Sequence, residues 1–447
     1  MTQQAQTSAG QPSPVMRWLV LLFVSMAMFG NYYIYDALGP VYDLLQQDLG
    51  FSYDQIGQIT SAYNIAALLV LLLGGYIIDR FGTKKAIFFF AVVCLLASVL
   101  RTAFPHFETM LAGQFLLGMG SEPLIVAATA TLAKWFKGRE LSLAFGLNLS
   151  ISRLGSFSAD QSTNFASGLY SNWQDPLWLA TGVAAVSVTA AMLYWMSEKR
   201  AESQYELGEA EETEKLKWSD IYNFGRSYWY VVALCVVFYA TIFPFRSFAI
   251  DYFQQAHGLS RQAAGTLNSV LPMAAIIATP LFGLLIDRVG KRAVFMMVGV
   301  VVMAPLFMLA TYLPPGPAID LGFGETEIMI PLTLIIVMLL FGVVFSLIPA
   351  AMWPSVAYIV DERRIGSAYA LMTFCQQVGW AVVPLVIGKL NTHYGASPDN
   401  IAGYTPGMWF YTFLALFGLF FAFKLWVTEK GPHGHGLDTI TAKSSAE

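Results

Sequence analysis

The sequence predicts an all-α, polytopic membrane protein in which twelve transmembrane helices form two pseudo-symmetric halves of six helices each. Three observations support this fold class: the composition, the number of long apolar runs and an internal repeat. Hydrophobic residues make up 56% of the 447 residues and charged residues only 12%, about half the charged fraction usual in soluble domains. The net charge of −4 and the lack of a basic patch argue against a nucleic-acid partner.

Twelve apolar runs are long enough to cross a bilayer as helices, which takes roughly 20 residues each. They cover residues 17–45, 56–78, 85–104, 108–133, 140–170, 177–196, 227–254, 262–286, 292–313, 328–358, 365–391 and 406–427. The longest polar stretch separates the first six runs from the last six. We therefore expect a cytoplasmic tail at 1–16, an amino-terminal six-helix bundle at 17–196, a cytoplasmic linker at 197–226, a carboxy-terminal six-helix bundle at 227–427 and a second cytoplasmic tail at 428–447.

The placement of lysine and arginine predicts the orientation. The 25 basic residues fall on the side of the two termini, with the exception of Arg101, Arg153, Arg246, Arg261 and Lys389. Basic residues concentrate in cytoplasmic loops, so both termini should be cytoplasmic.

The sequence also contains an internal repeat. At an offset of 208 residues, a gapless match runs from the first apolar run to the loop after the second. The matched pairs include Asp43 with Asp251, Gly50 with Gly258, Gly57 with Gly265 and Gly82 with Gly290. Further on, at an offset of 224 residues, Ala144, Leu147 and Gly155 meet Ala368, Leu371 and Gly379. Two six-helix halves in parallel repeat are typical of transporters whose site lies between the halves.

A short glycine-rich, charged loop occurs once in each half. The motif Gly75-x-x-x-Asp79-Arg80-x-Gly82 recurs as Gly283-x-x-x-Asp287-Arg288-x-Gly290. Glycine permits a tight turn, and we expect the Asp and Arg of each copy to form a conformational latch between helix ends. The alternative is that these charges only set the topology. The duplicated loop resembles the signature of the major facilitator superfamily, and the resemblance covers nearly the whole chain.

Two ionisable residues lie inside predicted spans at matching depth. Glu122 precedes Lys134 by 12 residues, and Arg153 follows Glu140 by 13 residues, on either side of one short cytoplasmic loop. At about 1.5 Å per residue, both stand roughly 18–20 Å above that loop, close to mid-membrane. Charges at this depth are costly. We therefore expect Glu122 and Arg153 to form either an ion pair or the two ends of a ligand site.

Further polar and aromatic residues are expected to face the same site. Helical spacing places Arg153, Ser156, Asp160, Asn164 and Ser167 on one stripe of the fifth span. Other candidates are Tyr35 and Asp36 in the first span, Arg246 in the seventh, Trp353 in the tenth and Gln377 in the eleventh. Tyrosines near the membrane surface often form an interfacial belt, but a belt needs no carboxylate, which favours a site around Asp36.

Three stretches resemble one branch of the superfamily, the lysosomal dipeptide transporters. They are residues 29–36, residues 118–122 continuing to 135–156, and residues 351–354 with 366–369. The resemblance implies facilitated diffusion of dipeptides, notably those with basic residues, and assigns the mid-membrane Glu and Arg of the branch to Glu122 and Arg153. The chain departs from the branch at Ala37 and Leu38, and its amino-terminal tail has no leucine. A plasma (cytoplasmic) membrane is therefore expected, with a lysosomal membrane as the alternative.

These observations predict an alternating-access uniporter for dipeptides or similar zwitterions. Arg153 would bind the terminal carboxylate through its planar donor fork, while Glu122, with Asp36 or Asp160, would meet the ammonium group. The alternatives are an organic-anion, amino-acid or drug carrier of the same superfamily, in which Arg153 binds a lone carboxylate, and a non-transporting membrane sensor.

Enzymatic chemistry is not indicated. The sequence has no nucleophile elbow, P-loop or zincin motif, and its three cysteines lie far apart in apolar runs, which predicts neither a disulfide framework nor a metal site. We expect no cofactor. The expected partners are a small-molecule substrate and the lipid bilayer; the chain should be a monomer, and an accessory subunit is not indicated.

Overall fold

The computed structural model describes residues 13–71, 82–136, 140–204, 218–322, 327–432 and 434–440. It confirms the all-α class of membrane protein that the composition and the apolar runs predict. Ten of the described helical segments are long and apolar enough to cross a membrane. Two more helices complete the twelve: α3, which is described for 19 residues, and α7, which carries the polar stripe.

The helices of the first half are α1 (Pro14–Asp36), α2 (Tyr42–Leu49), α3 (Tyr53–Leu71), α5 (Thr83–Ala103), α6 (Phe107–Phe136), α7 (Leu141–Phe165) and α8 (Gln174–Glu202). Those of the second half are α9 (Arg226–His257), α10 (Arg261–Val289), α11 (Arg292–Tyr312), α12 (Leu332–Ile359), α13 (Ile365–His393) and α14 (Thr405–Glu429). Short 3-10 helices occur at Gly39–Val41, Ser167–Ser171, Trp218–Asn223, Glu362–Arg364 and Ile401–Tyr404. Strands β1 (Ala318–Asp320) and β2 (Met329–Pro331) form a small antiparallel hairpin between α11 and α12, with Ala318 opposite Pro331.

The first predicted span is not one continuous helix. α1 ends at Asp36, and a turn and a 3-10 helix precede α2. Gly39 has a low helix propensity and Pro40 cannot donate a backbone hydrogen bond, so the helix stops before this pair. α2 then ends at Leu49 and is capped by Gly50, whose φ of 68° lies in the left-handed region that glycine adopts without a steric penalty.

Two predicted span ends also differ. The sixth span was expected to end at residue 196, but α8 continues to Glu202. The buried Glu198 accepts hydrogen bonds from Lys134 Nζ at 2.8 Å and from the Trp135 indole at 2.9 Å. This polar contact ties the end of α8 to α6. In the fifth span, α7 ends at Phe165, so Ser167 lies beyond the helix and does not extend the polar stripe.

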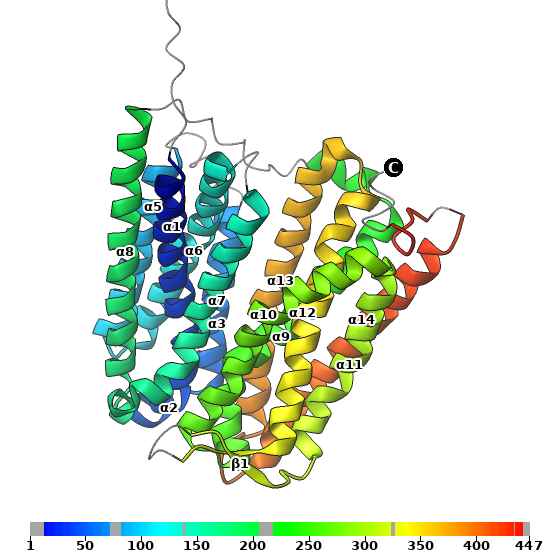
Figure 1. Ribbon diagram of the computed structural model, residues 1–447. Coiled ribbons are helices and arrows are strands. Elements are labelled where there is room, and N and C mark those ends of the chain that lie inside the picture. Colours follow the sequence, from blue (N-terminus) through cyan, green and yellow to red (C-terminus); the bar gives the residue numbers. More distant parts are fainter. Residues whose placement is uncertain are drawn as a thin grey trace, which may run out of the picture.

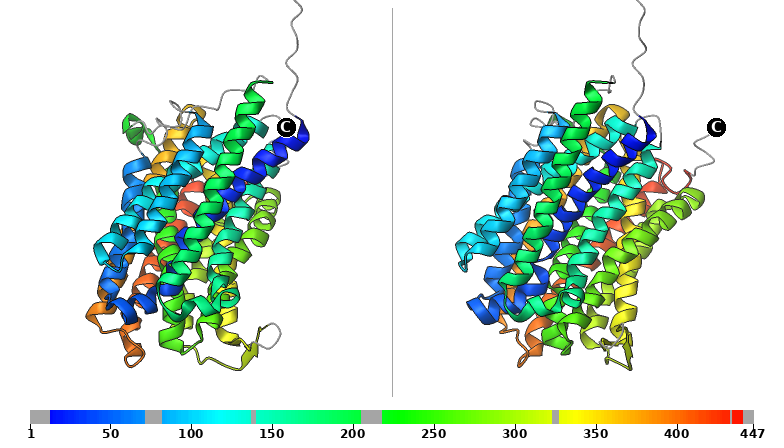
Figure 2. Two further views of the ribbon diagram at one scale, coloured as in Figure 1. Left: turned by 90° about the vertical axis from the view of Figure 1, so that its left-hand side faces the viewer. Right: turned by 60° about the vertical axis from the view of Figure 1, so that its left-hand side comes forward.

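The two halves stand side by side as separate bundles (Figure 1). The start of α1 and the end of α14 lie at one end of the molecule, which we call the terminal end; α2 and β1 lie at the other, which we call the opposite end. Rotated views show the same arrangement, with α1 and α8 crossing the outer face of the first bundle (Figure 2).

The halves contact each other mainly where α3 packs on α13 and where α7 packs on α10. A glycine lies at each crossing. A Cβ on Gly57 would stand 2.5 Å from the carbonyl oxygen of Pro384, and one on Gly265 would stand 2.6 Å from that of Asp160. These glycines match at the offset of 208, and Asp160 matches Pro384 at the offset of 224. The two crossings are therefore copies of each other.

The hydrophobic cores show where the halves join. One core cluster lies wholly in the first half, from Val20 to Ala201. The larger cluster fills the second half but also takes in residues of the first half near the opposite end, including Leu38, Leu45 and Ile56. The hydrogen bonds and ion pairs that join a described residue of one half to a described residue of the other lie at mid-depth or at the opposite end. The molecule is thus closed at the opposite end.

The segment 434–440 folds back on the second half. The side chain of Leu437 is fully buried, and the Arg292 guanidinium donates to the carbonyl oxygen of Ile440 at 2.8 Å. The carboxylate of Glu429 accepts hydrogen bonds from Ser227 and from the backbone N–H of His435. This part of the predicted tail is therefore packed against α9, α11 and α14.

Candidate functional site

A cavity of about 300 Å³ lies between the halves at mid-depth. It is lined by Asn31, Tyr32, Tyr35, Asp36, Tyr63, Ser121, Glu122, Ile125, Arg153, Ser156, Tyr239, Phe243, Arg246, Trp353, Thr373, Gln376, Gln377 and Trp380. The volume is within the range of small-molecule sites, and the lining combines aromatic rings with a few polar groups, as such sites usually do. Six of the seven predicted substrate-binding residues line it: Glu122, Arg153, Asp36, Tyr35, Gln377 and Trp353.

Glu122 enters this cavity from α6. One carboxylate oxygen accepts a hydrogen bond from the Tyr63 hydroxyl at 3.1 Å, and Gln377 of the second half lines the same cavity. The Tyr63 hydroxyl also lies 2.7 Å from the hydroxyl of Ser121. In the described part of the chain Glu122 forms no ion pair, and the neutral Tyr63 hydroxyl is the hydrogen-bond donor to its carboxylate.

Arg153 enters from α7 and is surrounded by aromatic rings. The centre of its guanidinium lies 5.4 Å from the ring centroid of Tyr32, 5.9 Å from that of Phe243 and 5.3 Å from that of Phe345. Such contacts stabilise a cation without neutralising it. Arg153 forms neither an ion pair nor a hydrogen bond with any described residue. Of the two predicted arrangements, the ion pair with Glu122 is therefore not formed in this conformation, and both residues line the cavity without an ion-pair partner among the described residues.

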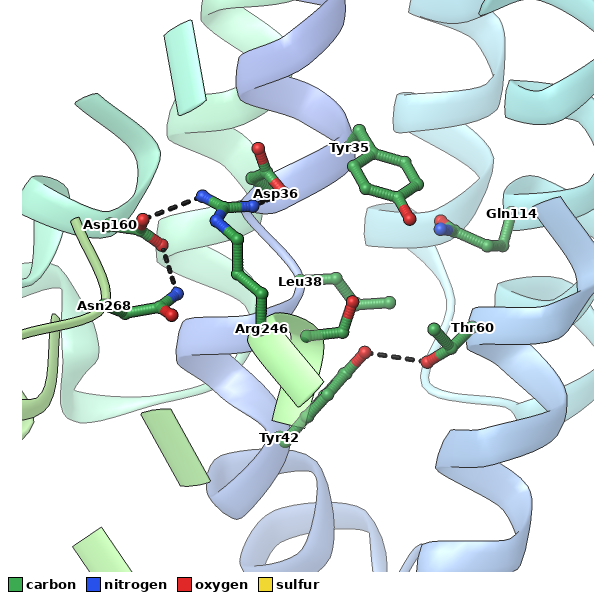
Figure 3. A pocket seen from close by; sticks show the side chains of 11 residues that line it. Tyr35, Asp36, Leu38, Tyr42, Thr60, Gln114, Asp160, Arg246 and Asn268 are labelled. Carbon is green, nitrogen blue, oxygen red and sulfur yellow. Dashed lines mark hydrogen bonds and ion pairs between the residues drawn. The ribbon is translucent and has the colours of Figure 1, made fainter. Parts of the chain in front are cut away.

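A second cation, Arg246, occupies the floor of the site toward the opposite end. Its guanidinium pairs with Asp36 of α1 and, at 2.8 Å, with Asp160 of α7. Asn268 of α10 donates to the other oxygen of Asp160 at 2.9 Å (Figure 3). The side chains enclose a water-sized pocket of about 20 Å³. Asp160 lines this pocket and not the cavity, and both predicted partners of a ligand ammonium, Asp36 and Asp160, already share one guanidinium.

Aromatic residues of both halves form the walls of the cavity. The Trp353 indole donates to the Tyr239 hydroxyl at 3.0 Å. The Trp380 ring packs against Phe243, with centroids 4.2 Å apart, and Tyr35 packs edge-on against Tyr63 at 4.6 Å. These rings give the cavity apolar sides between the two unpaired charges.

Three residues beside the charged groups, Tyr63, Tyr32 and Phe345, had no predicted site role. Phe345 stands next to Ser346, which the repeat aligns with Glu122, so the repeat carried a signal for it. Tyr32 belongs to the aromatic run that contains Tyr35 and Asp36. Nothing in the sequence distinguishes Tyr63 from the many other tyrosines, because its role depends on how α3 faces α6.

The two predicted latch residues of the second half, Asp287 and Arg288, do not line the cavity. Asp287, in the last turn of α10, forms an ion pair at 2.9 Å with Arg292, the first residue of α11, while Arg288 is exposed. The corresponding residues of the first half, Asp79 and Arg80, lie outside the described residues.

Comparison with known proteins identifies related sequences. The family model described as the Major Facilitator Superfamily matches residues 24–248 and 232–442. The lysosomal dipeptide transporter MFSD1 of Danio rerio is 29% identical over 390 residues, covering 84% of this chain and 80% of the relative. The Bos taurus protein of the same name is 30% identical, covering 84% of this chain and 79% of the relative.

Solved structures share the fold. A bacterial homologue of the human lysosomal transporter Spinster, in an inward-facing and occupied conformation, matches with a TM-score of 0.73 and 15% identity, over 93% of this chain and 98% of that one. A mutant of the nucleoside transporter NupG matches with a TM-score of 0.73 and 14% identity, over 91% of this chain and all of that one. These relatives are membrane transporters, which confirms the expectation that the chain is not an enzyme.

Proposed function

Because the chain belongs to the major facilitator superfamily, and is therefore a multi-pass membrane transporter of small molecules, we propose that it carries dipeptides by alternating access. The observation that supports this substrate is the pair of unpaired charges in one cavity: the Arg153 guanidinium and the Glu122 carboxylate. A dipeptide is a zwitterion and offers one group of each sign. The curated dipeptide transporters to which the chain is similar support the same substrate class.

Each charged residue then has a defined partner. Arg153 binds the terminal carboxylate through two parallel N–H donors, and the rings of Tyr32, Phe243 and Phe345 hold the guanidinium in place. Glu122 accepts the terminal ammonium. The floor of the site carries two carboxylates for one guanidinium, and this excess negative charge favours dipeptides with a basic side chain.

The binding test uses the purified full-length protein and lysyl-alanine. A ligand that binds the folded state raises the melting temperature, so the wild type should show a concentration-dependent increase. Glu122→Gln, Arg153→Gln and the double variant should remain folded, because neither residue is the other's ion-pair partner here, and should lose the increase. Asp399→Asn, in an exposed loop, is the control. If lysyl-alanine raised the melting temperature of the double variant as much as that of the wild type, Glu122 and Arg153 would not bind the substrate.

We also propose that transport is uniport, as the resemblance to facilitative dipeptide transporters implies. In proteoliposomes, the initial rate of lysyl-alanine uptake should then be the same with and without an imposed proton gradient. A rate that rises with the gradient would instead indicate proton coupling. Single amino acids, sugars and organic acids serve as competitors in the same assay and separate dipeptide transport from the carriage of anions or drugs.

We propose that the chain lies in a plasma membrane and that both of its termini are on the cytoplasmic side. A cysteine placed at the exposed Ser203, at the end of α8, should be protected from an impermeant thiol reagent in intact cells. A cysteine at Asp399, at the opposite end, should react. The native Cys94 and Cys235 are buried and Cys375 is partly buried, so their background reaction should be low. The reverse labelling pattern would overturn the orientation.

A further inference from the structure

Arg101, in the last turn of α5, is a buried cation that the proposed binding of the substrate does not use. The residue is 1% exposed and forms no ion pair with a described residue. Within the described part of the chain its guanidinium donates to two neutral groups: Nη1 to the Gln114 side chain of α6 at 2.9 Å, and Nη2 to the carbonyl oxygen of Ile34 in α1 at 3.0 Å. A charged residue inside a membrane span is costly, and such residues are candidates for a functional role.

The carbonyl oxygen of Ile34 lies in the last turn of α1. The helix ends at Asp36, and the carbonyl groups of the last four residues of a helix have no hydrogen-bond partner within it. The backbone N–H of Ala37 reaches back to one of them, the carbonyl of Tyr33, at 2.9 Å, and the Arg101 guanidinium satisfies the next. The carboxyl end of a helix also carries partial negative charge, which attracts a cation. Arg101 therefore caps the broken end of α1.

Close packing of α6 on α5 keeps Arg101 in this position. A Cβ on Gly113 would stand 2.9 Å from the backbone nitrogen of Arg101 and 3.0 Å from its Cβ, so a larger residue at this place would push the two helices apart. Gln114, the next residue of α6, lies beside the guanidinium and accepts a hydrogen bond from it. The arginine is thus fixed by α5 and α6 while it holds the end of α1.

The turn that is capped in this way also carries Asp36, two residues after Ile34. Asp36 lines the cavity, and one of its oxygens pairs with Arg246 (Figure 3). Its other oxygen forms no hydrogen bond with a described residue. Asp160 differs, because its two oxygens are bonded to Arg246 and to Asn268 and it does not line the cavity. Asp36 is therefore the floor carboxylate that a ligand in the cavity can reach.

We propose that Arg101 is a positioning residue: by capping α1 it holds Asp36 where the free carboxylate oxygen meets the cationic side chain of a basic dipeptide, an inference that rests on the proposed dipeptide transport. The floor has two carboxylates and one guanidinium that pairs with both, so a ligand cation balances the second carboxylate. The termini of the dipeptide are held from α6 and α7, by Glu122 and Arg153, whereas its side chain is contacted from α1. Arg101 therefore governs the side-chain preference and not the binding of the termini.

A positioning role and a purely electrostatic role of Arg101 predict opposite results. If Arg101 acted only as a nearby positive charge, it would repel a cationic ligand, and its removal would strengthen the preference for basic dipeptides. If it positions Asp36, its removal leaves the last turn of α1 without its cap and weakens that preference. The sign of the change in preference therefore separates the two roles.

The experiment measures the ratio of two dissociation constants by calorimetric titration of the full-length protein. Lysyl-alanine and norleucyl-alanine share their backbone, but norleucyl-alanine lacks the ammonium group at the end of the side chain. The wild type should bind lysyl-alanine about tenfold more tightly, the effect of one hydrogen bond between charged groups. Arg101→Met should remove this preference and leave the affinity for norleucyl-alanine unchanged. Arg101→Lys, which keeps the charge and can still donate to Ile34, should give an intermediate ratio.

Two further variants are controls. Arg200→Met, at the exposed end of α8, should keep the wild-type ratio. In an Asp36→Asn background, where the carboxylate is already removed, Arg101→Met should produce no additional change in the ratio, because the two residues act through one contact. The melting temperature of each variant shows whether it is folded.

The outcomes separate this inference from the proposed function. Equal binding of the two ligands by the wild type would refute the recognition of the side chain by Asp36 and its support by Arg101 while leaving dipeptide transport standing, and this measurement needs no variant to fold. A ratio that is unchanged or increased in a folded Arg101→Met, or an equal loss of affinity for both ligands, would refute the positioning role. The absence of binding of either ligand to the wild type would overturn both the inference and the dipeptide assignment.

Discussion

Two contacts that hold the halves together at the opposite end occupy equivalent places in the repeat but differ in chemistry. In the first, Asp43 of α2 binds Arg261 at the start of α10 through two hydrogen bonds, of 2.7 and 2.5 Å. In the second, Asp251 of α9 accepts one hydrogen bond of 2.7 Å from the hydroxyl of Tyr53 at the start of α3. At the offset of 208 residues, Asp43 aligns with Asp251 and Tyr53 aligns with Arg261. We call them the arginine contact and the tyrosine contact.

The neighbouring residues make the arginine contact and the tyrosine contact differ further. Arg261 also donates to the carbonyl oxygen of Pro40 at 2.5 Å and lies 5.2 Å from the ring centroid of Tyr170. In the tyrosine contact, the second oxygen of Asp251 has no partner among the described residues, and the Tyr53 hydroxyl lies 2.6 Å from that of Tyr404. Duplication has thus preserved the place of the contact but not its charge. One copy is an ion pair, and the other is a carboxylate held by a neutral hydroxyl.

The largest effect is expected from breaking the arginine contact. Arg261→Gln leaves the buried Asp43 carboxylate without its cation, and loss of one partner of a buried ion pair typically costs about 3–5 kcal/mol. The closed opposite end should become less stable. Spin labels at the exposed positions Ser171 and Asp399, one in each half, should report a population with a longer distance between them. An unchanged distance distribution would show that the ion pair does not keep this end closed.

The control for that variant removes both charges. Asp43→Asn combined with Arg261→Gln leaves no uncompensated charge, and replacing a buried ion pair by neutral groups is often close to neutral in stability. The distance distribution of the double variant should therefore return toward that of the wild type.

A smaller effect is expected from breaking the tyrosine contact. Tyr53→Phe removes one hydrogen bond to a carboxylate, which is worth about 1.5–3 kcal/mol, while it keeps the ring. The same pair of spin labels should show a smaller open population than Arg261→Gln produces. If Tyr53→Phe opens this end more than Arg261→Gln does, the tyrosine contact is the stronger one and the comparison is reversed.

The smallest effect is expected at the helix crossings, where the melting temperatures of matched glycine variants are compared. Gly57→Ala and Gly265→Ala each force a Cβ against a carbonyl oxygen, and overpacking of this kind costs about 1–3 kcal/mol. The nearest neighbours of Gly57 are all backbone atoms, whereas Gly265 also faces the Thr163 side chain, which can rotate. Gly57→Ala should therefore lower the melting temperature more than Gly265→Ala. Equal melting temperatures would mean that the Thr163 side chain gives no relief.

Much of the fold could be predicted from the sequence, because the bilayer fixes the length of an apolar helix and the repeat fixes the division into halves. The depth of Glu122 and Arg153 was predictable for a similar reason, since the helical rise converts residue counts into distances. The break after Asp36 had its signal in Gly39 and Pro40, but the continuous apolar run concealed it.

The pairing within the site could not be predicted in this way. Arg246 reaches Asp36 and Asp160 only because α9 of the second half packs beside α1 and α7 at the floor of the cavity. Depth along a helix does not say which side chains of two bundles meet. The same limit explains why the depth of Glu122 and Arg153 left two arrangements open, an ion pair or the two ends of a ligand site.

The packed segment 434–440 has a practical consequence for protein engineering. A polypeptide cut after Glu429 would lose the buried Leu437 side chain, and Arg292 would lose the Ile440 carbonyl to which it donates. This segment would then no longer link the ends of α9, α11 and α14. An affinity or fluorescent tag is therefore best joined beyond Ile440 through a linker, where it adds to the chain without replacing a piece of the fold.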